Sequence, residues 1–126
     1  MSYGTADAVP STKADVITQS LKDKLNPVKI ALAQINPTVG DFAGNTKKIL
    51  EFAQRAAAEG ADLAIFSELA VCGYPPADLL EKPSFIARAG QAVAEIAAWT
   101  AADGRPAILC GSVRNTTPRD RSVSYI

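Results

Sequence analysis

The sequence predicts an α/β fold built on a parallel sheet. Three short apolar runs, at residues 28–35, 62–66 and 107–113, have the length and composition of buried strands. Two longer segments between them, residues 45–59 and 85–102, carry apolar side chains at helical spacing. Because strands that alternate with helices usually become parallel neighbours, the order β-α-β-α-β favours one sheet covered by helices.

Turn residues bound the first helix. The first strand ends at Asn36-Pro37, and Asn45 is the expected N-cap of a helix that stops before Gly60. The apolar stripe of this helix consists of Ile49, Phe52, Ala53 and Ala56.

The second helix follows an irregular stretch, residues 67–83, which contains one glycine and three prolines. Ser84 is its expected N-cap, and Asp103-Gly104 is its expected end. Its apolar stripe consists of Phe85, Ala89, Ala92, Val93, Ile96 and Trp99.

The chain divides into a polar N-terminal extension, residues 1–26, and a folded part, residues 27–126. The extension is either flexible or a short amphipathic helix that begins after Ser11 or Thr12. Its apolar residues at helical spacing are Ile17, Leu21 and Leu25.

Composition excludes several classes of chemistry. The 126 residues include no histidine and two cysteines, so the chain alone cannot form a Ser–His–Asp triad, a Cys–His pair or an ordinary zinc site. Cys72 and Cys110 lie in apolar surroundings and are expected to be reduced, buried thiols.

Lys plus Arg and Asp plus Glu both number 13, which gives no electrostatic reason to expect nucleic acid as a partner. No membrane-spanning run and no secretory signal are evident, so we expect a soluble protein in the cytoplasm. The basic residues near the end are expected to lie on a solvated loop: Arg114, Arg119 and Arg121.

Glu68 is the strongest candidate for chemistry. It interrupts an apolar run where the second strand should end, and functional groups of parallel sheets gather at that edge. Apolar neighbours would desolvate the carboxylate and tune it as a general base, although a solvated glutamate at a strand exit is the structural alternative. Tyr74 could line a pocket or simply pack in its loop, and Asp41 and Asp78 have the sequence context of turn residues.

A nucleotide-binding loop is not supported. Gly40 and Gly44 do not form a G-x-G-x-x-G pattern, and Pro37 stands where its tight turn would be. No G-x-x-x-x-G-K-[ST] run is present either.

Two longer motifs resemble a known family. Residues 28–35 with Asn36-Pro-Thr-Val-Gly-Asp41 and Gly44-Asn45 resemble the opening of the nitrilase-type carbon-nitrogen hydrolase domain of glutamine-dependent NAD synthetases. Phe66-Ser-Glu-Leu69 with Gly73-Tyr-Pro-Pro-Ala-Asp-Leu-Leu80 resembles the segment that holds the family's catalytic glutamate. The resemblance covers residues 27–113, and Ala77 replaces the glutamate commonly found in the G-Y-P-P motif.

The resemblance implies a glutaminase that uses a Glu–Lys–Cys triad to supply ammonia for NAD synthesis. Glu68 would be the general base and Tyr74 would line the glutamine pocket. The cysteine would attack the glutamine amide, and the lysine would stabilise the charged intermediate. ATP and magnesium would serve a separate synthetase domain, and this segment itself would need no cofactor or metal. The parent would be a homo-oligomer.

The family's lysine and cysteine are expected beyond residue 113, so Lys82, Cys72 and Cys110 come too early for those roles. The resemblance therefore implies that the chain is the first part of an α-β-β-α sandwich and that it is inactive alone. Such a part should leave one sheet face and its strand edges uncovered. Two alternatives stay open: a piece of another nitrilase-type amidase, and a non-catalytic interaction module.

Overall fold

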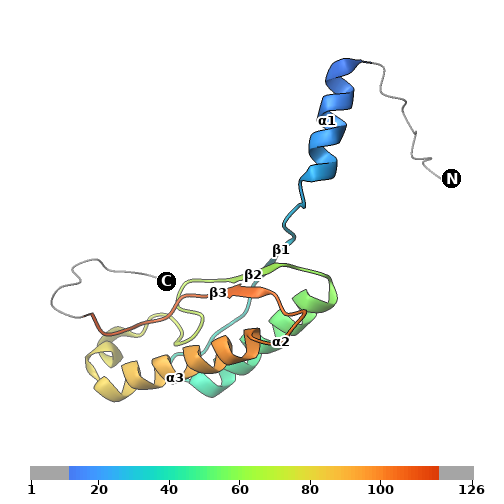
Figure 1. Ribbon diagram of the computed structural model, residues 1–126. Coiled ribbons are helices and arrows are strands. Elements are labelled where there is room, and N and C mark those ends of the chain that lie inside the picture. The colour runs from blue at the N-terminus through green and yellow to red at the C-terminus, as the bar shows by residue number, and fades with distance from the viewer. Residues whose placement is uncertain (1–11, 117–126) are drawn as a thin grey trace.

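The computed structural model describes residues 12–116, of which residues 30–109 form a helical layer on one side of a parallel sheet (Figure 1). The strands β1 (Ile30–Ala33), β2 (Leu63–Phe66) and β3 (Ala107–Leu109) pair in the order β1-β2-β3. Helices α2 (Phe42–Ala58) and α3 (Pro83–Thr100) connect them. The predicted β-α-β-α-β order is therefore confirmed.

Both helices cover the same face of the sheet (Figure 1). This follows from chain order, because successive strands are added in one direction and parallel crossovers are right-handed. The inner face carries mostly small residues, which let the helices approach closely: Ala31, Ala33, Ala64, Phe66 and Ile108. The helices contribute buried aliphatic residues to the core, namely Ile49, Ala53, Ala56, Ala89, Ala92 and Ile96.

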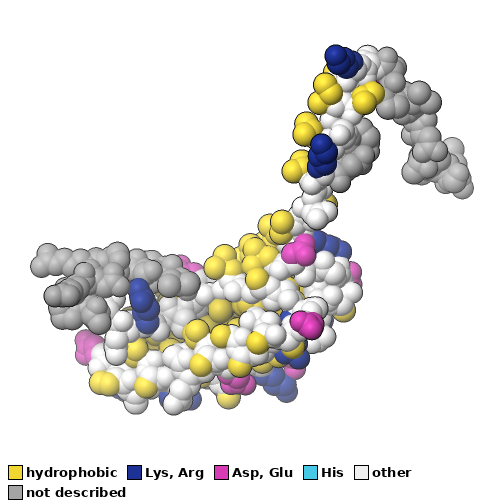
Figure 2. Space-filling view, in the orientation of Figure 1, with side chains coloured by type: hydrophobic (Ala, Val, Ile, Leu, Met, Phe, Trp, Pro, Cys, Tyr) yellow, Lys and Arg dark blue, Asp and Glu magenta, His cyan; other side chains and the backbone are white. Residues whose placement is uncertain are grey.

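The outer face of the sheet is uncovered among the described residues, so the strands are buried on one face only. Leu32 is 81% exposed, Ile30 52% and Leu109 48%, and hydrophobic side chains gather along this side of the molecule (Figure 2). Successive side chains of a strand point to opposite faces of the sheet. Each strand is a continuous apolar run in the sequence because the side chains on both faces are mostly apolar. The expected uncovered sheet face is present.

The helix N-termini differ from those expected. Asp41, not Asn45, caps α2, and its Oδ1 accepts a 3.0 Å hydrogen bond from the Gly44 amide. Helix α3 begins at Pro83, whose missing N–H costs nothing at a first helical position, so Ser84 lies inside the helix.

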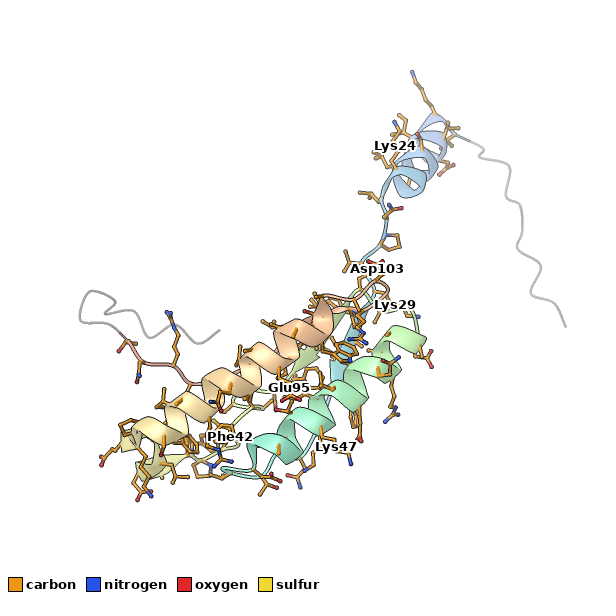
Figure 3. The ribbon with its side chains drawn as sticks, turned by 60° about the horizontal axis from the view of Figure 1, so that its bottom comes forward. Lys24, Lys29, Phe42, Lys47, Glu95 and Asp103 are labelled. Atoms are coloured by element: carbon orange, nitrogen blue, oxygen red, sulfur yellow. The ribbon has the colours of Figure 1, made fainter. Side chains whose placement is uncertain are left out.

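The two helices contact each other near these N-termini. The rings of Phe42 and Phe85 meet edge to face at 5.0 Å, and Phe42 lies at the start of α2 beside α3 (Figure 3). The Arg88 guanidinium lies 4.8 Å from the Phe42 ring centroid. The ring pair therefore joins the N-terminal end of α2 to the N-terminal end of α3.

The third strand is shorter than the predicted residues 107–113. Beyond Leu109 the chain leaves the regular ladder, and the carbonyl of Gly111 instead accepts a hydrogen bond from Val71, in the loop after β2. The irregular stretch after β2 includes one short 3₁₀ helix, η1 (Ala77–Glu81).

The N-terminal extension contains a helix, α1 (Lys13–Lys24), capped by Thr12, whose side chain accepts from the Asp15 amide. Its apolar residues are half or more exposed, and it lies apart from the sheet (Figure 1). Of the two alternatives for this segment, the structure shows the helix over Lys13–Lys24. Ser11, Arg119 and Arg121 lie outside the described residues. Within residues 12–116, no helix combines the length and apolar character needed to cross a membrane.

Thr46→Val is expected to stabilise the fold by about 1 kcal/mol. Thr46 is 2% exposed and its hydroxyl has no hydrogen-bond partner, so the folded state buries a polar group without compensation. Valine has nearly the same shape and lacks that group. Urea unfolding of both proteins measures the difference, and Thr46→Ser, which keeps the hydroxyl and loses the methyl group, should instead be destabilising. A loss of stability in Thr46→Val would mean that the Thr46 hydroxyl does have a hydrogen-bond partner in the folded state.

Candidate functional site

Glu68 lies just beyond the carboxyl end of β2, at a sharp turn. Leu69 has a φ of +53°, a left-handed conformation that is costly for a side chain other than glycine. The Ala70 amide donates to the Ser67 carbonyl at 3.3 Å, and the Gly73 amide donates to the Leu69 carbonyl at 2.8 Å. The turn therefore reverses the chain directly after Glu68.

The same turn exposes the Glu68 side chain, so the structure has the solvated glutamate at a strand exit and not the carboxylate desolvated by apolar neighbours. Leu69 and Val71, its apolar neighbours in sequence, point inward, with exposures of 7% and 0%. An apolar run flanking a carboxylate thus does not desolvate it when the chain turns within the run. The Glu68 carboxylate is therefore in contact with solvent, and a side chain or ligand at this edge of the sheet can reach it.

The loop after β1 packs directly against the segment that follows Glu68. The Gly40 amide donates to the Cys72 carbonyl at 2.9 Å. Gly73 has a φ of +82°, and a Cβ on it would lie 2.6 Å from the backbone N and Cα of Val39. Only glycine allows this approach without displacing the loop.

The end of β3 packs against the other side of the turn. The Val71 amide donates to the Gly111 carbonyl at 3.3 Å. A Cβ on Gly111 would lie 2.4 Å from the Leu69 amide nitrogen and 3.0 Å from the Glu68 Cα. The segments that follow β1 and β3 therefore both pack against residues 67–73, the turn that carries Glu68 at the end of β2. This is the edge of the sheet where function was expected.

The structure places the secondary candidates differently. Tyr74 is 74% exposed, so it is not a packed loop residue, and its phenol is available to a ligand. Asp41 is a capping residue, as the structural interpretation expected. Asp78 is exposed in the first turn of η1, and Lys82 is exposed at the start of α3.

Neither cysteine has the surroundings of a nucleophile. Cys72 is fully buried, and burial raises the pKa of its thiol despite an opposing backbone hydrogen bond. Burial also raises the pKa of the Cys110 thiol, although Cys110 is only half-buried rather than buried as expected. Nucleophilic cysteines need a lowered thiol pKa, and both residues are free thiols.

Asn45 is a further residue of this edge that the sequence interpretation assigned wrongly. It is fully buried, and its side chain joins the loop after β1 to the segment after β2. The signal was available, since Asn45 lies at i−4 from Ile49 on the apolar stripe of α2. A polar residue on that stripe indicates a buried hydrogen-bonding role, which the N-cap assignment obscured.

The chain resembles carbon-nitrogen hydrolases in sequence. The profile of the carbon-nitrogen hydrolase family matches residues 29–122. A glutamine-dependent NAD(+) synthetase of Synechocystis sp. is 50% identical over 86 residues, which are 67% of this chain and 15% of that protein. The corresponding enzyme of Thermotoga maritima is 49% identical over 59 residues, which are 47% of this chain and 10% of that protein.

A solved structure has a similar fold over most of this chain. Glutamine-dependent NAD+ synthetase from Acinetobacter baumannii, in complex with adenosine diphosphate, superposes with a TM-score of 0.63 and 38% sequence identity. The superposition covers 73% of this chain and 16% of that chain. The chain therefore spans less than one fifth of the length of these relatives.

Proposed function

Because this chain belongs to the carbon-nitrogen hydrolase family, we propose that it is the first part of a glutaminase domain that supplies ammonia for ATP-dependent NAD synthesis. Its nitrilase-like α/β fold contributes one sheet and one helical layer of the α-β-β-α sandwich. The observation that carries the proposal is the position of Glu68, on a turn to which all three strand ends contribute contacts. The supply of ammonia to an ATP-dependent reaction suits the cytoplasm.

In this proposal the Glu68 carboxylate acts as the general base. It accepts the proton of a cysteine thiol as the sulfur attacks the side-chain amide carbon of glutamine. The C–N bond then breaks as the amide nitrogen takes up the proton, which releases ammonia and leaves a glutamyl thioester. Glu68 next deprotonates the water that hydrolyses the thioester. The exposed phenol of Tyr74 is suited to bind the glutamine substrate beside this centre.

The cysteine and the lysine of the triad are proposed to come from outside residues 12–116. Cys72 and Cys110 have raised thiol pKa values, and Lys82 lies at the N-terminus of α3, beyond η1. An exposed Glu68 remains accessible to a thiol that a further segment carries to the sheet edge.

ATP and magnesium are assigned to a separate synthetase domain. Within residues 12–116, no three His, Cys, Asp or Glu side chains are grouped so that they could hold a metal ion. Homo-oligomerisation of the parent enzyme is part of the same proposal.

A chimera tests the function. The matched 86-residue segment of the Synechocystis relative is replaced by this chain's segment, and ammonia and glutamate release from glutamine are measured. The chimera should hydrolyse glutamine, whereas the 126-residue chain alone should show only background release. A folded chimera that hydrolyses a different amide would instead favour another nitrilase-type amidase. Turnover by the chain alone would contradict the need for an external nucleophile.

The uncovered outer sheet face favours a second candidate, a non-catalytic assembly module. Ile30, Leu32 and Leu109 present aliphatic side chains there, and such surface usually marks an interface. A single discrete oligomer of the chain in sedimentation, together with an inactive but folded chimera, would support this candidate over the glutaminase.

A further inference from the structure

The Asn45 side chain forms three hydrogen bonds to backbone groups. Its Oδ1 accepts from the Thr38 amide at 2.7 Å, and its Nδ2 donates to the Thr38 carbonyl at 2.8 Å and to the Val71 carbonyl at 3.1 Å. Both hydrogens of the carboxamide are therefore used, and the Thr38 pair fixes which end of the group is the donor. No other residue type of this size offers one acceptor and two donors.

These bonds connect segments that are distant in sequence. Thr38 lies in the loop after β1, seven residues before Asn45, and Val71 lies 26 residues after it, in the turn after β2. The same two segments are also joined by the Gly40–Cys72 hydrogen bond and by the close approach of Gly73 to Val39. Asn45 thus holds two strand-exit loops together from inside the core.

The hydrogen bond from Asn45 to Val71 is coupled to Glu68 through a few backbone hydrogen bonds. The Val71 amide is held by Gly111 while the Val71 carbonyl is held by Asn45, so the end of the turn is held from both sides. Glu68 lies three residues earlier, and the Ser67–Ala70 and Leu69–Gly73 hydrogen bonds close the turn between them. Displacing Val71 would therefore move the backbone that directs the Glu68 carboxylate.

We propose that Asn45 is a positioning residue of this site, one that sets the direction of Glu68 by holding the Val71 carbonyl to the Thr38 loop. The catalytic meaning of that direction rests on the proposed function, whereas the structural coupling does not. Asn45 itself touches no reacting group. Its effect is transmitted entirely through the backbone of residues 67–73.

The thiol of Cys72 reports opening of this contact in the 126-residue chain. In a Cys110→Ser background it is the sole thiol, and it is fully buried one residue beyond Val71. Asn45→Ala should raise the rate of Cys72 modification by dipyridyl disulfide about 10- to 100-fold, because three buried hydrogen bonds are lost. The amide chemical shifts of Glu68 and Leu69 should move in the same variant.

Asn45→Asp separates hydrogen bonding from space filling. Aspartate has the same shape and still accepts from the Thr38 amide, but it directs a carboxylate oxygen at the carbonyls of Thr38 and Val71. At neutral pH the Cys72 thiol should therefore react as fast as in Asn45→Ala. At about pH 5 the raised pKa expected for a buried carboxyl restores one donor, so labelling should fall toward the wild-type rate at the same pH.

Ile49→Ala is the matched control, since it removes fully buried atoms from the same helix and leaves the three hydrogen bonds of Asn45 in place. It should accelerate hydrogen exchange throughout the core, whereas the Asn45 variants should act selectively on residues 38–40 and 67–73. Equal labelling of Asn45→Asp and wild type at every pH would overturn the proposal. So would opening at Cys72 without any shift at Glu68. Because no step measures hydrolysis, these outcomes are independent of the glutaminase assay.

Discussion

Glutamine hydrolysis by the chimera should fall about 10²- to 10⁴-fold when Glu68 is replaced by glutamine, with the loss in kcat rather than in KM. Glutamine has nearly the shape of glutamate but cannot accept the proton of the nucleophile. Because Glu68 is exposed on its turn, the substitution should leave the fold intact. Steady-state ammonia release, measured with thermal unfolding of both proteins, checks the two statements together.

Glu95→Gln is the control for this substitution. Glu95 is exposed on α3, in the helical layer and not at the strand ends (Figure 3). Its replacement by glutamine removes the same negative charge as Glu68→Gln does. It should leave kcat and KM unchanged. If Glu68→Gln raises KM and spares kcat, Glu68 binds substrate instead of moving protons. If neither constant changes, the base lies elsewhere and the proposed role of Glu68 is wrong.

The strands and helices could be predicted because the spacing of apolar side chains differs between a strand and a helix. That spacing does not depend on which surface covers the side chains. The faces of the sheet could not, because a run such as the one through Ile30 and Leu32 looks the same whether a layer covers its outer side or not. Leu32 is aliphatic and 81% exposed in the described structure. Apolar content therefore indicates which surfaces need cover, and it does not say which segment provides the cover.

The site could be located from the sequence, but its environment could not. Parallel topology alone directs attention to Glu68, at a strand end. Its exposure depends on Leu69, which adopts a positive φ without being glycine, so no residue type signals the turn. Asn45 shows the converse problem, because a residue common at N-caps served a buried role one turn later. Both errors arise where tertiary contacts decide over local preference.

The close packing of the two strand-exit loops predicts a large effect for Gly73→Ala. The new methyl group would lie 2.6 Å from the Val39 backbone, and alanine would also have to adopt a φ of +82°. Backbone strain costs about 1–2 kcal/mol and overpacking about 1–3 kcal/mol, so the free energy of unfolding should fall by about 2–5 kcal/mol. Urea unfolding of both proteins, with the same stabilising osmolyte in every sample, measures the loss.

Two other glycines separate the contributions. Gly60 has a φ of +74° with open space around it, so Gly60→Ala should cost only the backbone term. Gly111 has no positive φ but lies against the Leu69 amide, so Gly111→Ala should cost only the overpacking term. Gly73→Ala should exceed each of them and approach their sum, since both causes act at one atom. A cost no larger than that of Gly60→Ala would mean that the loops are not in contact in solution, and the frame that directs Glu68 would then be absent as well.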